Sequence, residues 1–253
     1  MLRKRVIPCL LLHHCGLVKT VRFKHPKYIG DPMNAVKIFN EKFVDEIIFL
    51  DIDASEEHRG PDFEHIGEIC NECFIPFCYG GGIRKIEDAE RLFTIGVEKI
   101  VLNTILFQRE NLLTDMAHQF GSQSIVAAMD VRKKRFSGYV VMAERGKMTT
   151  RMHPIEYARK LEELGAGELF VNAIDRDGMM QGYDRELLRQ IAAAVSIPVI
   201  ACGGAGHIQH IADLFQYTAV LAAAAGSVFV FQGPHKAVLI NYPSSKELKA
   251  IIT

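Results

Sequence analysis

The sequence lacks an excess of charge of either sign, because its 253 residues contain 30 basic and 30 acidic side chains. A dedicated nucleic-acid surface is therefore not expected, since such a surface gathers cations against the phosphate backbone. No apolar run approaches the roughly 20 residues that a membrane-spanning helix needs. No low-complexity linker divides the chain, and 49% of its residues are hydrophobic. We therefore expect one globular domain over residues 1–253, with a large core.

The sequence also lacks the cysteine spacing of a disulfide framework. Its six cysteines are Cys9, Cys15, Cys70, Cys73, Cys78 and Cys202. Most of them lie in apolar runs, so we expect reduced thiols and a cytoplasmic protein. Cys70 and Cys73 form a single C-x-x-C motif without a second pair of ligands. The groups His13-His14-Cys15 and His207-x-x-His210 resemble metal-binding motifs only when each is taken by itself. We expect no metal site and no cofactor.

The N-terminal apolar run Val6–Leu12 follows the basic residues Arg3-Lys4-Arg5, an order that faintly resembles a signal peptide. The run is short, two histidines follow it, and no small-x-small cleavage pattern is present. We therefore expect this run to form a first buried strand.

Short apolar runs alternate with amphipathic stretches along the chain. The runs are apolar on both faces, as in parallel strands beneath a layer of helices. They are Val6–Leu12, Ile47–Leu50, Phe74–Cys78, Ile100–Leu102, Ile125–Met129, Leu169–Val171, Ile197–Ala201 and Val220–Ala224. The helix-like stretches are Asp31–Phe43, Phe63–Glu72, Ile86–Ile95, Leu112–Phe120, Pro154–Leu164, Asp184–Val195 and Ile208–Phe215. This α/β pattern predicts a single (β/α)8 TIM barrel, with a doubly wound open sheet as the alternative.

The two halves of the chain repeat one pattern, which two similar half-barrels explain better than an open sheet does. Gly80-Gly81-Gly82-Ile83 is followed by Asn103-Thr104, and Gly203-Gly204-Ala205-Gly206 is followed by Gly226-Ser227. Glycine lets backbone N–H groups approach a phosphate oxygen closely, where a Cβ would block that approach. We expect one phosphate site in each half, and hence a ligand with a phosphate at each end. Tight turns without a ligand are the alternative.

Two segments lie outside this repeat. Arg135–Met142 and Lys147–Arg151 are strand-like and follow the fifth apolar run, so we expect a hairpin at the rim of the active site. The tail from Val238–Tyr242 through Leu248–Ile252 is expected to close the barrel as a last helix.

Polar residues end the apolar runs, and in a TIM barrel the active site lies at the carboxyl ends of the strands. They are Asp51, Asn103, Asp130, Asn172, Asp175 and Asp177. Residues at such positions take part in chemistry or cap the next helix, and both interpretations stay open for Asp53 and Asn103. For Asp130 the sequence favours a catalytic role over helix capping. Asp130 directly ends the fifth strand, and the basic loop Arg132–Arg135 follows it instead of an obvious helix.

A second group of charged residues lies where strands begin, at the opposite end of the expected barrel. Its members are Arg5, Glu46, Lys99 and Glu168. Two cations and two anions could close that end as a salt-bridged ring. Ordinary solvated charges at strand starts are the alternative, and by themselves the better one.

Several motifs together resemble one known family. They are Arg3-Lys4-Arg5, Leu50-Asp51-Ile52-x-Ala54-Ser55, Gly80-Gly81-Gly82-Ile83, Asn103-Thr104, Phe120-Gly121-Ser122-Gln123, Asp175-Arg176-Asp177-Gly178-x-x-x-Gly182-Tyr183-Asp184 and Gly203-Gly204-Ala205-Gly206. From Met1 to about Phe231 the chain resembles HisF, the cyclase subunit of imidazole glycerol phosphate synthase. The resemblance implies a bisphosphorylated ribulosyl-aminoimidazole substrate across the mouth of the barrel. It also implies that a HisH-type glutaminase docks at the other end and supplies ammonia through the core.

The resemblance assigns roles to individual residues. Asp130 becomes a catalytic acid/base, while Asp51 and Lys19 belong to the mouth. It places one phosphate at Gly81, Gly82, Asn103 and Thr104. It places the other phosphate at Asp177, Gly178, Gly204, Gly226 and Ser227. It makes Arg5, Glu46, Lys99 and Glu168 the ammonia gate, which reverses the preference for solvated charges.

One residue departs from the HisF pattern. The family uses an aspartate at the end of strand 1 as the partner of Asp130, and this chain has Leu11 there. A leucine cannot transfer a proton, and loss of one member of an acid/base pair commonly lowers rates by orders of magnitude. The segments Pro8–Leu12, Gly16–Thr20, Tyr28–Ala35 and Ile38–Asn40 are similar to HisF-like proteins associated with glycosyl amidation.

Three functions follow from these resemblances. In the first, the barrel receives ammonia from the glutaminase and supports a sugar amidotransferase in the synthesis of a surface polysaccharide such as the lipopolysaccharide O-antigen. In the second, the chain is a working cyclase of histidine biosynthesis, with His13 or His14 as the nearby replacement for the missing acid/base. In the third, it is a non-catalytic phosphate-binding scaffold.

Overall fold

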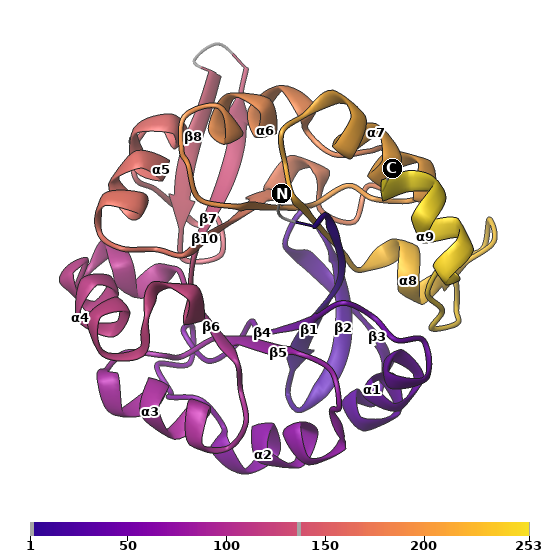
Figure 1. The fold of residues 1–253 in the computed structure, drawn as a ribbon, viewed down its shortest axis with the longest axis horizontal. Coiled ribbons are helices and arrows are strands. Elements are labelled where there is room, and N and C mark those ends of the chain that lie inside the picture. Colours follow the sequence, from indigo (N-terminus) through magenta and orange to yellow (C-terminus); the bar gives the residue numbers. More distant parts are fainter. Residues whose placement is uncertain (1–2, 136–137, 253) are drawn as a thin grey trace.

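The structure is a computed structural model that describes residues 3–135 and 138–252. Within these residues, eight parallel strands form a closed barrel, because the pairing that starts at β1 returns from β12 to β1. Around the barrel the strands are β1 (Arg5–His13), β4 (Ile47–Asp51), β5 (Phe77–Gly80), β6 (Lys99–Leu102), β7 (Ile125–Lys134), β10 (Glu168–Ala173), β11 (Val199–Cys202) and β12 (Ala222–Ala225). Helices surround them (Figure 1). The predicted TIM barrel is confirmed, and the open sheet is excluded.

Several helices of the outer layer begin after a residue whose side chain caps the first turn. Their bounds are α1 Pro32–Glu41, α2 Phe63–Glu72, α3 Ile86–Thr94, α4 Asn111–Phe120, α5 Pro154–Glu163, α6 Arg185–Ala192, α7 Ile208–Tyr217, α8 Ser227–Val230 and α9 Ser245–Ile252. Asp31, Asp62 and Asp184 precede α1, α2 and α6, and each accepts a backbone N–H of the first turn. Helices α1 to α7 confirm the seven predicted stretches to within a few residues.

The strands separate two apolar clusters. The larger one fills the space between the strands and the helices and includes Phe39, Phe49 and Leu214. The smaller one fills the inside of the barrel. Its buried members are Ile7, Cys9, Ile48, Cys78, Val101, Val126, Ala128, Phe170, Ile200, Ala222 and Ala224. Because successive side chains of a strand point to opposite faces, both clusters draw on the same strands.

A hairpin of β2 (Gly16–Val21) and β3 (Lys24–Gly30) extends β1 antiparallel, with His13 opposite Gly16. The sequence analysis expected no strands between the first strand and α1. The turn between β1 and β2 is His14-Cys15, with φ of 46° and 62°, and the turn between β2 and β3 is Arg22-Phe23, with φ of 52° and 63°. Turns of this kind usually carry asparagine and glycine, so the local turn signal is missing.

Strand β7 does not end at Asp130, as predicted, but continues to Lys134. The segment Arg132–Lys134 is therefore strand and not a loop. It pairs antiparallel with β8 (Gly138–Ala143), which pairs with β9 (Met148–Thr149). The rim hairpin is thus confirmed with other bounds; residues 136–137 of the predicted segment lie outside the described residues.

Two further predicted bounds were wrong. The run Phe74–Cys78 becomes strand only from Phe77, and Phe74 is 83% exposed. In the tail, a short hairpin of β13 (Phe231–Gln232) and β14 (Ala237–Val238) comes first, and the last helix begins at Ser245. Tyr242 ties the tail to the barrel by donating from its hydroxyl to the carbonyl oxygen of Val6 at 2.7 Å.

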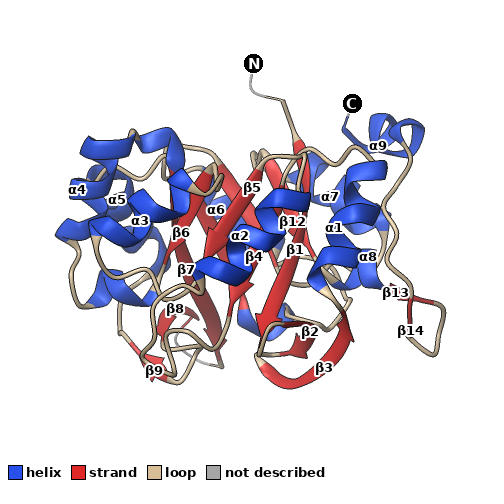
Figure 2. Ribbon diagram, turned by 90° about the horizontal axis from the view of Figure 1, so that it is seen from below, coloured by secondary structure: helices blue, strands red, loops and turns tan. Residues whose placement is uncertain are grey.

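The two ends of the barrel differ. The hairpins β2–β3 and β8–β9 extend from one end, whereas both ends of the described chain and helix α9 lie towards the other (Figure 2). We call the end with the hairpins the mouth and the opposite end the base. Among the described residues, no helix has the length and hydropathy needed to cross a membrane.

Candidate active site

A cavity of about 710 Å³ opens at the mouth. Strand ends and both hairpins line it, including many residues that the sequence analysis selected. Of those, the lining contains Leu11, Lys19, Asp51, Gly81, Gly82, Asn103, Thr104, Asp130, Asn172 and Asp177. The lining does not include Gly178, Gly204, Gly226 or Ser227. The residues predicted for the first phosphate therefore share one wall, whereas those for the second are represented only by Asp177.

Asp130 lies on β7 within the lining and is 8% exposed. Burial raises the pKa of its carboxyl to about 7, against the opposing effect of a hydrogen bond from Asn103. The Nδ2 of Asn103 donates to Oδ2 of Asp130 at 2.9 Å. A carboxyl with this pKa exchanges a proton readily at neutral pH, which is the property of a general acid/base. Asn103 makes no side-chain cap hydrogen bond, and its side chain contacts Asp130 instead.

Other carboxylates of the lining have structural partners. Asp51 accepts from Arg59 at 2.8 Å and from the backbone N–H groups of Asp53 and Ala54. Asp177 accepts from the Thr20 hydroxyl at 2.7 Å, which fastens hairpin β2–β3 over the mouth. These contacts hold the neighbouring loops in place. Among the carboxyls of the lining, Asp130 is the buried one whose pKa is strongly raised.

Leu11 lines the same cavity from β1, opposite Leu50 of β4 in register. The wall that faces β7 across the mouth therefore offers an apolar side chain. At this position β1 therefore supplies no side chain that could transfer a proton together with Asp130.

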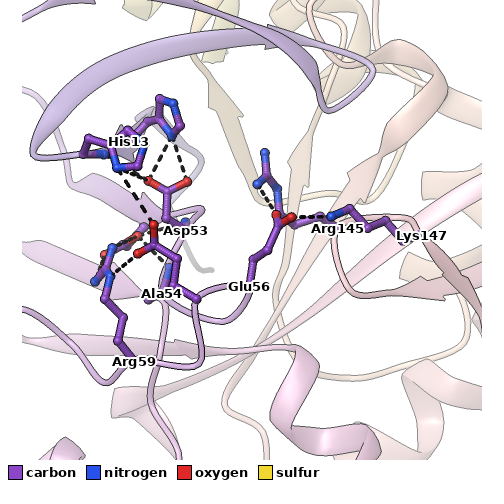
Figure 3. A network of polar contacts seen from close by, with 10 residues as sticks. His13, Asp53, Ala54, Glu56, Arg59, Arg145 and Lys147 are labelled. Atoms are coloured by element: carbon purple, nitrogen blue, oxygen red, sulfur yellow. Dashed lines mark hydrogen bonds and ion pairs between the residues drawn. The ribbon is translucent and has the colours of Figure 1, made fainter.

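His13 and His14 do not belong to the lining of this cavity. The Nδ1 of His13 lies 2.8 Å and 2.9 Å from the two oxygens of Asp53, and the His14 backbone N–H donates to Asp53 at 3.0 Å (Figure 3). His14 lines a separate cavity of about 590 Å³ beside α2. Neither histidine is therefore placed to replace the missing acid/base at the mouth, as the second function had required.

Asp53 neither caps a helix nor lines the cavity; it holds the β1–β2 turn. Burial by itself raises the pKa of this carboxyl, but hydrogen bonds from His13 and His14 lower it overall. Ligand atoms of His13, His14 and Asp53 lie within 4.8 Å of one another, a grouping that could hold a metal ion. Internal hydrogen bonds already account for both Asp53 oxygens, and we assign this cluster a structural role.

Glycines at the turns allow close backbone contacts. Gly82 has φ of +71°, and a Cβ there would meet the Arg59 carbonyl oxygen. Gly204 has φ of +112°, and a Cβ there would overlap the Gly182 carbonyl oxygen. The protein's own packing thus already demands glycine at both turns. At each of the two turns, the requirement for glycine is explained by the tight turn alone, and it is also compatible with phosphate binding.

Lys19 places a positive charge beside Gly226, at the end of β12. It lies on β2, is 8% exposed, and its Nζ lies against Gly226. A charged amine beside backbone N–H groups suits an anionic group better than a neutral one.

The sequence analysis missed three charged residues at the rim of the cavity. Arg145 donates to Glu56 at 2.6 Å, and Lys147 pairs with the same carboxylate (Figure 3). All three line the cavity and link the loop after β4 to the turn between β8 and β9. The basic loop before β9 was the available signal, but only the folded chain brings Glu56 to it.

The four charged residues of the base form the predicted ring. Arg5 contacts Glu46 at 2.5 Å and Glu168 at 2.9 Å, and Lys99 contacts Glu46 at 3.1 Å and Glu168 at 3.3 Å. Their side chains are only 3–20% exposed, so the solvated alternative was wrong. We call these four residues the charged ring. The inner apolar cluster separates it from the mouth cavity.

Comparison with known proteins agrees with this architecture. Residues 5–235 match the family model described as "Histidine biosynthesis protein". A Pseudomonas aeruginosa protein provisionally named imidazole glycerol phosphate synthase subunit hisF2 is 54% identical over 248 residues, which cover 98% of this chain and 99% of that protein. The imidazole glycerol phosphate synthase subunit HisF of Chlorobium phaeobacteroides is 41% identical, with 92% of each chain covered. The chain therefore belongs to the HisF family of histidine biosynthesis proteins.

Proposed function

We propose that this chain is the acceptor barrel of a glutamine amidotransferase, which joins ammonia to a phosphorylated ligand at the mouth. The observation that carries the proposal is the placement of the charged ring and Asp130 at opposite ends of the inner apolar cluster. Small neutral molecules cross such an apolar interior more readily than ions do, because burying a charge is costly. Ammonia entering at the base would thus reach Asp130 without losing its nucleophilic lone pair to a proton.

The names of the relatives favour imidazole glycerol phosphate synthase as the reaction. In that reaction the ribulosyl-aminoimidazole bisphosphate and ammonia give imidazole glycerol phosphate, an aminoimidazole carboxamide ribotide and one water molecule. Asp130 would transfer the protons. Gly81, Gly82, Asn103 and Thr104 would hold one phosphate, and Asp177, Gly178, Gly204, Gly226 and Ser227 would hold the other, assisted by Lys19. Ammonia would come from a HisH-type glutaminase bound over the charged ring.

Leu11 favours a second candidate function. A barrel that only passes ammonia on needs no acid/base pair, and Leu11 leaves Asp130 without the partner that ring closure uses in the family. In this function the barrel supports a sugar amidotransferase that forms an amidino sugar of a surface polysaccharide. The retained phosphate-binding residues would then hold a phosphorylated acceptor or a regulatory ligand.

Cyclase turnover with ammonium salts and the bisphosphorylated substrate, without a glutaminase, separates the two candidates. Supplied ammonia removes the dependence on a partner, so the measurement reports only the chemistry of the barrel. We expect measurable product from the first function, at a rate reduced by the absence of a carboxylate at position 11. Binding of the substrate without product would support the amidation function, and no binding at all would contradict the cyclase function.

A Lys99→Ala substitution is expected to uncouple glutamine hydrolysis from the use of ammonia. Lys99 links Glu46 to Glu168, and its removal opens one side of the charged ring while the phosphate-binding residues stay in place. The ratio of glutamate released to aminated product, measured with the HisH-type glutaminase present, should rise above that of the unmodified chain. An unchanged ratio would argue against a gate at this position. Lys37→Ala, which removes an exposed surface pair with Glu72, is the control.

A further inference from the structure

Two phenylalanines at the base of the barrel lie almost entirely in solvent. Phe43 is 86% exposed and Phe74 is 83% exposed, the two highest values among the large exposed hydrophobic residues of the described chain. Single exposed apolar residues are common on protein surfaces. Two exposed phenylalanines on neighbouring segments are less so, because each could bury about 150–250 Å² in contact with a partner.

The backbone at Phe43 is unfavourable for a phenylalanine. Helix α1 ends with Lys42 as its C-cap, and Phe43 follows with φ of +54°. Glycine is the usual residue at this position after a helix, because a side chain is strained in the left-handed conformation. The chain therefore holds a strained residue here whose ring makes little contact with the rest of the protein.

Asn40 holds both phenylalanines in place. Its carbonyl oxygen accepts from the Phe43 N–H at 3.1 Å, and its Oδ1 accepts from the Phe74 N–H at 3.1 Å. Its Nδ2 donates to the carbonyl oxygen of Glu72, the last residue of α2. One side chain thus fixes the ends of α1 and α2 relative to each other, and α1 and α2 are neighbours around the barrel (Figure 1).

Both phenylalanines lie in the segments that lead into β4 and β5, at the end of the barrel that carries the charged ring. Glu46 of the ring follows Phe43 by three residues, at the start of β4. The carbonyl oxygen of Pro76, two residues after Phe74, accepts from the N–H of Ile47 at 2.9 Å. A protein that delivers ammonia into the ring must cover this surface.

We infer that Phe43 and Phe74 form an aromatic anchor that inserts into an apolar pocket of the ammonia-supplying glutaminase subunit. The inference rests on the proposed function, which requires such a subunit at the base. It adds the residues that hold the partner, and it explains why the chain keeps a strained phenylalanine where glycine would fit better. Aromatic residues at the centre of an interface commonly dominate its binding energy.

The test uses the full chain and the purified HisH-type glutaminase encoded in the same genome, with affinity measured by titration calorimetry. Phe43→Gly and Phe74→Ser should each weaken binding about tenfold or more. Tyr28→Ser is the matched control, since Tyr28 is an exposed aromatic residue on the hairpin at the mouth and should leave the affinity unchanged. Phe43→Gly should also keep or raise the melting temperature of the isolated chain, because glycine relieves the strained φ.

The outcomes separate this inference from the proposed function. Binding by the unmodified chain that neither phenylalanine variant weakens would overturn the anchor and leave the glutaminase partner intact. An unmodified chain that fails to bind the glutaminase would contradict both. Sedimentation of the isolated chain as a dimer that Phe43→Gly dissociates would also overturn the inference, because the anchor would then bind a second copy of this chain.

Discussion

Asp130→Asn is expected to lower ammonia-dependent turnover by about 100-fold to 10,000-fold, the usual contribution of a general acid/base. Asparagine has nearly the same shape and its amide oxygen can still accept from Asn103, so binding of the ligand should change little. The rate with saturating ammonium and bisphosphorylated substrate is the measurement. Asp175→Asn is the control, because Asp175 accepts from the Lys133 N–H and lies outside the cavity lining. Equal losses in both variants would argue against a special role for Asp130.

The same substitution should change the dependence of stability on pH. Burial raises the pKa of Asp130 to about 7 in the folded chain, against about 3.9 for an exposed aspartate. A raised pKa favours the folded state at low pH, and that contribution is lost as the pH rises through about 7. Asparagine does not ionise, so Asp130→Asn removes this pH-dependent loss of stability. Its free energy of unfolding should therefore exceed that of the unmodified chain by on the order of a few kcal/mol at pH 8, and by less at pH 5. Urea titrations at the two pH values measure the difference, and this readout needs no substrate.

Glu46→Ala is expected to destabilise the chain by about 3–5 kcal/mol, the cost of removing one member of a buried ion pair. Glu46 is 2% exposed and contacts both cations of the charged ring. Burial raises the pKa of its carboxyl, although Lys99 and Arg5 lower it, which shows that desolvation is the larger cost at this site. Without Glu46, the buried Arg5 and Lys99 would share only Glu168. The free energy of unfolding from a urea titration is the measurement.

Glu72→Ala provides the comparison for Glu46→Ala. Glu72 forms a surface pair with Lys37 at 3.5 Å, with both side chains about half exposed. Such pairs contribute less than about 1 kcal/mol, so this variant should unfold close to the unmodified chain. If the two variants lost similar stability, the charged ring would contribute no more than a surface pair does.

Local patterns were sufficient for most of the fold. The apolar runs and helical spacings predicted the barrel strands and helices α1 to α7, because burial against a helical layer imposes those periods on the sequence. The strands β2 and β3 were missed because the turns that join them to β1 and to each other use His14-Cys15 and Arg22-Phe23, and not the asparagine and glycine that usually mark such turns. The continuation of β7 beyond Asp130 was missed because Arg132–Lys134 is polar, and its pairing with β8 supplies the stabilisation that the local sequence does not.

In the candidate site, too, some features were predictable from the local sequence and others were not. Asp130 and the glycine turns were predicted from residue types at strand ends, whereas the charged ring was predicted only through the resemblance to HisF. The direction in which each side chain points could not be predicted, because it depends on which strands are neighbours in the barrel. His13 and His14 precede the hairpin closely in sequence, yet Asp53 from the loop after β4 holds them away from the mouth cavity.

The sequence by itself determined that this chain forms a barrel of two similar halves with a glycine turn in each. It also determined which charges stand at the strand starts, and that position 11 carries no carboxylate. Only the tertiary structure decided the pKa of Asp130, the closure of the charged ring and the exposure of Phe43 and Phe74. The reason is physical: secondary structure follows from periodicity over a few neighbouring residues. Desolvation, ion pairing and exposure depend on distances between segments that lie far apart in the chain.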